Sequence, residues 1–130
     1  MKEYQVAVVF RADHFADLLR GMHPLDEFAT AHQSWRIAKN RHVDFLFMVR
    51  HRIITDVGTV IRIEPIPARY AYMNNEDISG RSRFIVSLEV PSFVEEFVGQ
   101  PAPESESYRN PVQFFSLHHD VLGNTATLAR

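Results

Sequence analysis

The sequence has no cysteine among its 130 residues. This excludes disulfide bonds, cysteine-rich zinc sites and thiol nucleophiles, and it is typical of a protein from a reducing compartment. No apolar run approaches the roughly 18 residues of a membrane-spanning helix. The apolar stretch at residues 4–10, interrupted by Gln5, is too short for a secretory leader. We therefore expect a cytoplasmic protein without a membrane partner.

Motifs of the common enzyme classes are also missing. The sequence contains no phosphate-binding glycine loop, no serine nucleophile elbow, no HExxH zinc motif and no dinucleotide-binding fingerprint. We therefore expect a protein that is not an enzyme, with no catalytic residue and no cofactor. A small hydrolase stays open as an alternative, with His118, His119 and Asp120, or His32, as its candidate groups. A nuclease is the other form of this alternative, with Asp44, Asp56 and Glu64 as its candidate carboxylates.

The seven histidines raise the question of a metal site. His118 and His119 are adjacent, and adjacent side chains on an extended strand point to opposite faces. A shared metal would therefore need a different local structure and a third ligand from a distant segment. We predict no metal site.

The composition otherwise resembles that of an ordinary globular domain. Hydrophobic residues make up 45% and charged residues 23% of the chain, which includes ten phenylalanines. A chain of 130 residues matches the usual size of one domain and buries enough surface for a core of its own. We predict a single domain over residues 1–130.

The net charge of −2 hides an asymmetry along the chain. Residues 36–83 carry nine Lys and Arg against five acidic residues, a net charge of +4, whereas residues 84–130 have a net charge of −4. A basic middle segment is typical of a surface that faces an anion. Solvated strand edges are an equally good interpretation.

Hydrophobic periodicity predicts both helices and strands. Helices are expected over residues 13–21, 24–34 and 92–98, the last opened by a Ser-x-x-Glu capping box and closed by Gly99. Strands are expected over residues 4–10, 43–49, 53–64, 84–90 and 112–117, with a short one near Tyr70 and Tyr72. A polar turn at residues 50–52 should join the second and third of these strands. Val57 and Ile63 should share one face, and Leu88 should point inward. The run 43–49 is apolar on both faces, as in a central strand, and Gly58 indicates a bulge or bend. The edge of the last strand is expected to be open to a partner and the tail 118–130 to be peripheral.

These elements predict an α+β fold. We expect a small mixed, partly closed β-barrel of about five to six strands, with two or three short helices at its rim.

Trp35, the single tryptophan, stands out as a candidate binding residue. It precedes a basic stretch, and an indole beside guanidinium groups suits base stacking combined with phosphate contacts. Packing of Trp35 in the core is the alternative. The candidate nucleic-acid-binding residues from this reasoning are Trp35, Arg36, Lys39, Arg41, Tyr70 and Tyr72.

A family resemblance rests on the same region of the chain. It is carried by Ser34-Trp35-Arg36, Asn40-Arg41, residues 44–47 and Ile53-Ile54-x-x-Val57-Gly58-x-Val60. These segments resemble the PUA-like superfamily, and most of all its EVE branch, to which the ASCH and YTH domains are related. The resemblance implies a barrel whose pocket receives one nucleotide base, often a modified one. It implies that Trp35 stacks on the base, that Asn40 bonds to its polar edge, and that Arg36 and Arg41 meet phosphates.

Two classes of function therefore remain open besides the small enzyme. The first is a nucleic-acid-binding module, of the PUA-like type and able to read a modified base, with RNA or DNA as its partner. The second is a non-catalytic domain that binds a small molecule or another protein. The sequence leaves the oligomeric state undecided.

Overall fold

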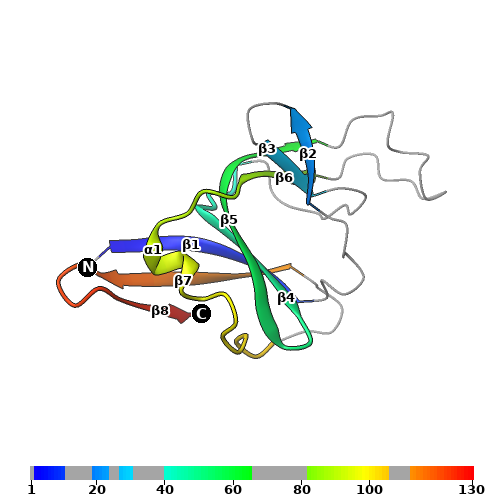
Figure 1. Cartoon of the computed structure of the whole chain (residues 1–130). Coiled ribbons are helices and arrows are strands. Elements are labelled where there is room, and N and C mark those ends of the chain that lie inside the picture. Colours follow the sequence, from blue (N-terminus) through cyan, green and yellow to red (C-terminus); the bar gives the residue numbers. More distant parts are fainter. Residues whose placement is uncertain (1, 11–18, 24–26, 31–39, 66–81, 106–111) are drawn as a thin grey trace.

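The computed structural model describes residues 2–10, 19–23, 27–30, 40–65, 82–105 and 112–130. In these ranges the chain forms eight strands and one short helix (Figure 1), in the order β1 (Lys2–Val9), β2 (Leu19–His23), β3 (Glu27–Thr30), β4 (Phe45–Arg50), β5 (Ile53–Pro65), β6 (Ser82–Ser87), α1 (Ser92–Glu95), β7 (Val112–Asp120) and β8 (Thr125–Ala129). All eight strands join one open sheet, ordered β2-β3-β6-β5-β4-β1-β7-β8. The described chain is mostly β, so the predicted α+β, partly closed barrel with two or three helices is wrong.

The two helices predicted in the first third of the chain fall on strands wherever the chain is described. β2 overlaps the end of the first predicted helix, and β3 lies inside the second. These strands pair with each other, and β3 also pairs with β6, which comes more than fifty residues later in the sequence. Pairing with a distant strand outweighs the local helical spacing of the apolar residues. The other parts of both predicted helices lie outside the described residues.

β1 and β4 are parallel neighbours in the middle of the sheet, in the register Val6↔Phe45 to Val9↔Met48. The predictions of a strand over 4–10 and of a central strand over 43–49 are confirmed. Residues 6–9 and 45–49 are buried on both faces of the sheet. Runs that are apolar on both faces are typical of strands covered on both sides. The sheet therefore requires cover on each face.

The first face is covered by α1. Phe93 on α1 packs against Tyr4 and Phe45, and Phe97, just beyond the helix, packs against Phe47. The predicted short helix is confirmed, but its N-cap is Pro91, and Ser92 makes no side-chain capping bond. The helix ends before Gly99, which has a φ of 89°. No helix among the described ranges is long and apolar enough to cross a membrane.

A second apolar cluster occupies the opposite face. Its buried members come from five segments: Ala7, Val9, Val43, Leu46, Met48, Phe84, Val86 and Val112. Phe84 and Val86 belong to β6, which confirms the strand predicted over 84–90. That strand ends at Ser87, and the exposed Leu88 lies outside the core instead of pointing inward as predicted.

The predicted polar turn after β4 is confirmed as a two-residue hairpin loop. Arg50 pairs with Ile53, and the two residues between them, His51 and Arg52, have φ values of 52° and 65°. Two consecutive positive φ values are typical of the type I′ turn, whose twist matches that of the flanking strands. The turn therefore presents His51 and Arg52 to solvent.

β5 changes the face that its apolar residues occupy. The register shifts at two places, which leaves Thr55 and Ile61 without a paired residue opposite. Because each shift moves the following side chains to the other face, Val57 packs in the first cluster and Ile63 against the second. The prediction that Val57 and Ile63 share a face is wrong, and the irregularities flank Gly58 instead of lying at it. β5 curves from the hairpin with β4 to β6 (Figure 1).

β7 confirms the last predicted strand and extends it to Asp120. The tail after residue 120 is not peripheral, because β8 pairs with β7 in the register His118↔Thr127. β7 lies between β1 and β8, so the prediction that its edge is open is also wrong. One edge of the sheet is formed by β8 instead.

Gly58 is required by the close approach of β6. A Cβ atom at Gly58 would lie 3.2 Å from the carbonyl oxygen of Ser87 and 3.3 Å from Cβ of Val86. We expect Gly58→Ala to lower the free energy of unfolding by about 1–3 kcal/mol, because the added methyl forces β5 and β6 apart. Urea denaturation measures the change. The control is Gly123→Ala, whose methyl would meet the exposed side chains of Asp120 and Thr125 and no backbone atom among its nearest contacts, and which should change stability by less than about 0.5 kcal/mol. A Gly58→Ala variant as stable as the parent would contradict this packing.

Candidate nucleic-acid interface

Two of the predicted binding residues lie in the described segment that leads into β4. Asn40 and Arg41 are both exposed. The guanidinium carbon of Arg41 lies 3.5 Å from the ring centroid of Phe114 on β7, within the distance of a cation–π interaction. Phe114 in turn packs against the second apolar cluster. The ring therefore holds Arg41 against the sheet while its side chain stays open to solvent.

Two further arginines lie at the other end of β4. Arg50 closes the strand, and Arg52 belongs to the hairpin turn. Because side chains alternate along a strand, the side chain of Arg50 projects from the same face of the sheet as Leu46 and Met48. Leu46 and Met48 belong to the second apolar cluster, which Phe114 also contacts. Arg41 and Arg50 thus share one face of the sheet. Phe114, which Arg41 contacts, pairs with Ala7, and Ala7 pairs with Leu46. Arg50 lies four residues beyond Leu46, an offset of about 13 Å along the strand direction at about 3.3 Å per residue.

The acidic side chains of residues 40–65 are engaged by protein groups. Asp44 accepts a hydrogen bond from the backbone N–H of Gln5 at 2.8 Å and contacts Nε2 of His42 at 2.9 Å. Asp56 accepts a hydrogen bond from the hydroxyl of Thr55 at 2.9 Å. Within the part of the chain that the structure describes, no acidic side chain pairs with the arginines at 41, 50 and 52. This segment therefore presents cations that are available to an anion.

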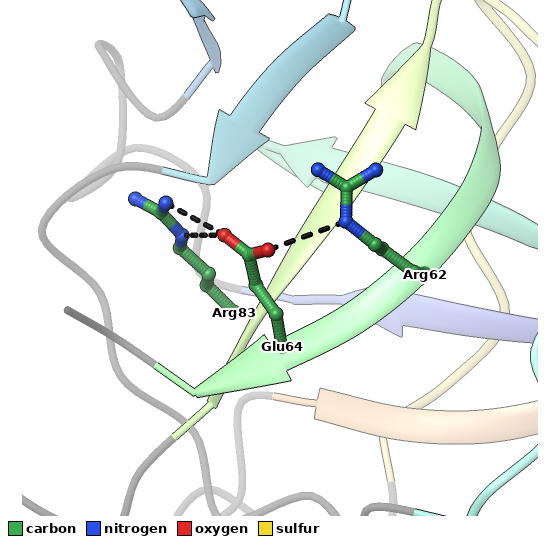
Figure 2. A network of polar contacts seen from close by, with 3 residues as sticks. All are labelled: Arg62, Glu64 and Arg83. Atoms are coloured by element: carbon green, nitrogen blue, oxygen red, sulfur yellow. Dashed lines mark hydrogen bonds and ion pairs between the residues drawn. The ribbon is translucent and has the colours of Figure 1, made fainter.

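Glu64, the third acidic residue of this segment, holds together two other arginines (Figure 2). Nε and Nη2 of Arg83 lie 3.0 and 2.7 Å from one carboxylate oxygen of Glu64, and Nε of Arg62 lies 3.2 Å from the other. Glu64 and Arg83 face each other in the β5–β6 ladder, and only 6% of the Arg83 side chain is exposed. A buried guanidinium needs such a partner because an unpaired buried charge is strongly unfavourable. Arg62 and Arg83 therefore serve the fold.

The ion pairs also set the acidity of Glu64. Burial by itself raises the pKa of this carboxyl, but hydrogen bonds from Arg83 and Arg62 and their positive charge lower it by more. The pKa of Glu64 consequently lies below its ordinary value of 4.5.

The adjacent histidines of β7 point to opposite faces of the sheet, as predicted from strand geometry. His119 is buried and stacks on Phe93, with ring centroids 3.8 Å apart and an interplanar angle of 12°. Its Nε2 atom has no hydrogen-bond partner among the described residues. His118 is half-buried on the other face. The described ranges contain no group of three His, Cys, Asp or Glu side chains that could hold a metal ion.

The structure places only part of the predicted site. It describes Asn40 and Arg41 and brings Arg41 to Phe114, a ring that the sequence did not single out. The predicted residues that lie outside the described ranges are Trp35, Arg36, Lys39, Tyr70 and Tyr72. Sequence reasoning included Arg50 and Arg52 in the basic segment but not in the site. The position of Arg50 at the end of a strand and of Arg52 in the two-residue turn that follows is the signal that could have found them.

Comparison with known proteins does not extend this picture. No protein-family model, no curated protein and no solved structure matches the chain. The resemblance to the PUA-like superfamily stays a prediction, and the function has to be argued from the residues themselves.

The acidity of Glu64 predicts how stability depends on pH. Because the folded-state pKa lies below the unfolded value of about 4.5, the ion pairs stabilise the fold fully above that pH, and this stabilisation is lost as the pH falls through the lowered pKa. We expect Glu64→Gln to lower the free energy of unfolding by about 1–3 kcal/mol at pH 7. The difference from the parent should shrink below about pH 4.5, where Glu64 of the parent becomes protonated.

Urea titrations at a series of pH values from neutral to acidic test this expectation. Glu89→Gln is the matched control, because Glu89 is exposed in the loop after β6 and no described cation pairs with it. A difference between Glu64→Gln and the parent that stayed constant down to the lowest pH would show that the charge of Glu64 is not what stabilises the fold.

Proposed function

We propose that this chain is a cytoplasmic nucleic-acid-binding module without catalytic activity. The observation that carries the proposal is the charge balance around β4. Arg41, Arg50 and Arg52 face solvent without an acidic partner among the described residues, whereas each acidic side chain of the same segment is engaged within the protein. Guanidinium groups of this kind bind phosphate through several N–H donors at once. A phosphate backbone is the anion that presents charges along the whole length of a strand.

The arrangement favours a single-stranded nucleic acid. Arg41 and Arg50 lie on one face and are offset by about 13 Å along the strand direction, so an extended backbone crossing this face would meet both. Asn40, next to Arg41, carries the amide donor and acceptor that a base edge requires. Base recognition, including that of a modified base, is proposed for Asn40 together with stacking on Trp35. Tyr70 and Tyr72 are proposed as further aromatic contacts.

Removal of single arginines should change both affinity and its dependence on salt. We expect Arg41→Gln, Arg50→Gln and Arg52→Gln each to weaken binding of a short single-stranded RNA or DNA at every base composition. Each should also reduce the slope of log K against log salt by about 0.7 in magnitude, the value for one lost phosphate contact on a single strand. Fluorescence anisotropy with labelled oligonucleotides between about 50 and 200 mM salt measures both quantities.

The matched control for this series is Lys2→Gln. It removes one positive charge from an exposed residue at the start of β1, outside the segment proposed to bind. The slope for Lys2→Gln should equal that of the parent. If all four variants lowered the slope equally, the binding would reflect overall charge, and the assignment of the three arginines would be wrong. If the parent bound neither RNA nor DNA, the proposed function itself would be wrong.

Trp35 tests the base-stacking part of the proposal separately. We expect Trp35→Ala to weaken binding of a single strand by about 1–3 kcal/mol, because a stacked base loses its aromatic surface. Trp35→Phe should retain part of the affinity, since it keeps a ring. The free energy of unfolding is measured for the same variants. A Trp35→Ala variant that loses stability but binds with the affinity of the parent would place the indole in the core and remove its stacking role.

A further inference from the structure

The outer edge of the sheet at β8 lacks the charged residue, the proline and the bulge that commonly keep sheet edges from pairing. β8 follows a tight turn and runs Thr125-Ala126-Thr127-Leu128-Ala129, with no charged residue and no proline. Its ladder with β7 is regular from Ser116↔Ala129 to Asp120↔Thr125, without a bulge. Natural sheets protect an edge with lysine, proline or a bulge, because unpaired N–H and C=O groups recruit another strand.

No described strand pairs with the second edge of β8, which stands last in the sheet order. The strand lies on the outside of the sheet next to β7 (Figure 1). Antiparallel pairing with a further strand would satisfy the free backbone groups along this edge.

The side chains of β8 identify the partner strand that fits. Centred on Thr127, an antiparallel pairing of β8 with a copy of itself places Thr127 opposite Thr127 and Ala126 opposite Leu128 of the second copy. Ala126 and Leu128 are half-buried against the first apolar cluster, whereas Thr125, Thr127 and Ala129 are exposed on the other face. Each side chain therefore meets one that prefers the same environment. Threonine pairs and apolar pairs directly opposite each other are favourable cross-strand contacts.

The turn before β8 adds exposed apolar surface at the same edge. Val121 is 61% exposed and Leu122 fully exposed, which makes them the two most exposed large hydrophobic residues of the described chain. The side chain of Asp120 accepts a hydrogen bond from the N–H of Leu122 at 3.1 Å, so the turn is held in place. In the antiparallel pairing this turn approaches the C-terminal end of β8 in the second copy, where its apolar side chains would be partly covered.

From these observations we propose that two copies of this chain associate through β8. The edges pair antiparallel about a two-fold axis at Thr127 and form one continuous sheet of sixteen strands in the dimer, twice the eight strands of one copy. The strand carries no charge of its own, so no like charges oppose this pairing. The dimer does not depend on the proposed nucleic-acid binding, since the pairing uses the backbone edge of β8, whereas Arg50 lies on β4 and Arg41 lies over Phe114 of β7.

The test uses the full chain and two substitutions at the two-fold axis. Analytical ultracentrifugation should show a dimer of the parent at concentrations up to several hundred micromolar. Thr127→Lys and Thr127→Glu should each be monomeric, with a dissociation constant raised at least about tenfold, because two like charges face each other. An equimolar mixture of the two variants should dimerise again, since the charges are then opposite. Leu88→Lys, at an exposed apolar position outside this edge, is the control and should leave the dimer intact.

Three results would overturn the proposal. These are a monomeric parent at the highest concentration, a dimer that neither charge at Thr127 weakens, and a mixture of variants that stays monomeric while each variant is folded by circular dichroism. If a variant does not fold, amide hydrogen exchange of the parent decides. Outward-facing N–H groups of β8 should become protected as the concentration rises, and protection that does not change with concentration would refute the pairing.

Discussion

Burial of both faces of β1 and β4 is the constraint on which the rest of the structure depends. Residues 6–9 and 45–49 are at most 4% exposed, and they lie side by side in the middle of the sheet. Full burial of an aliphatic or aromatic side chain stabilises the fold by about 1.5–3 kcal/mol, so a sheet with one bare face would lose much of its stability. Both faces therefore carry apolar cover. α1 supplies it on the first face, and Phe84 and Val86 of β6 contribute to the second cluster.

The curvature of β5 makes this double cover compatible with a single sheet. Its unpaired residues, Thr55 and Ile61, shift the alternation of side chains, so the two halves of the strand serve different clusters. Between them Gly58 allows β6 to approach, because the backbone of Ser87 occupies the space that a side chain would need. Two bulges and a glycine within one strand increase its twist and bend it. The β6 side of the sheet consequently turns away from β1, β7 and β8 (Figure 1).

The same pairings determine which charges reach the surface. Arg83 is buried opposite Glu64, and the same carboxylate also binds Arg62. Two of the nine cationic residues in the basic segment therefore contribute to the fold. Asp44 is likewise held by the N–H of Gln5 at the β1–β4 junction. Because these acidic side chains are engaged within the protein, Arg41, Arg50 and Arg52 are the described cations of this segment that have no acidic partner. The net charge of the segment alone does not reveal this division.

The sequence by itself determined those elements whose signals are local. The apolar runs of β1 and β4, the polar hairpin turn, the strand at β6, the short helix before Gly99 and the opposite directions of His118 and His119 follow from alternation and turn chemistry over a few residues. The basic segment and its candidate residues Asn40 and Arg41 could be found in the same way.

Only the tertiary structure decided the remaining features, because each depends on residues far apart in the chain. β3 is a strand because it pairs with β6, and β2 pairs in turn with β3. The helical spacing of their apolar residues carries no information about these partners. β8 joins the sheet through β7, and Arg41 becomes part of a site through Phe114, more than seventy residues later. Local patterns predict which residues are buried and which are exposed. They do not predict which strands and side chains meet, because pairing between distant segments has no local signature.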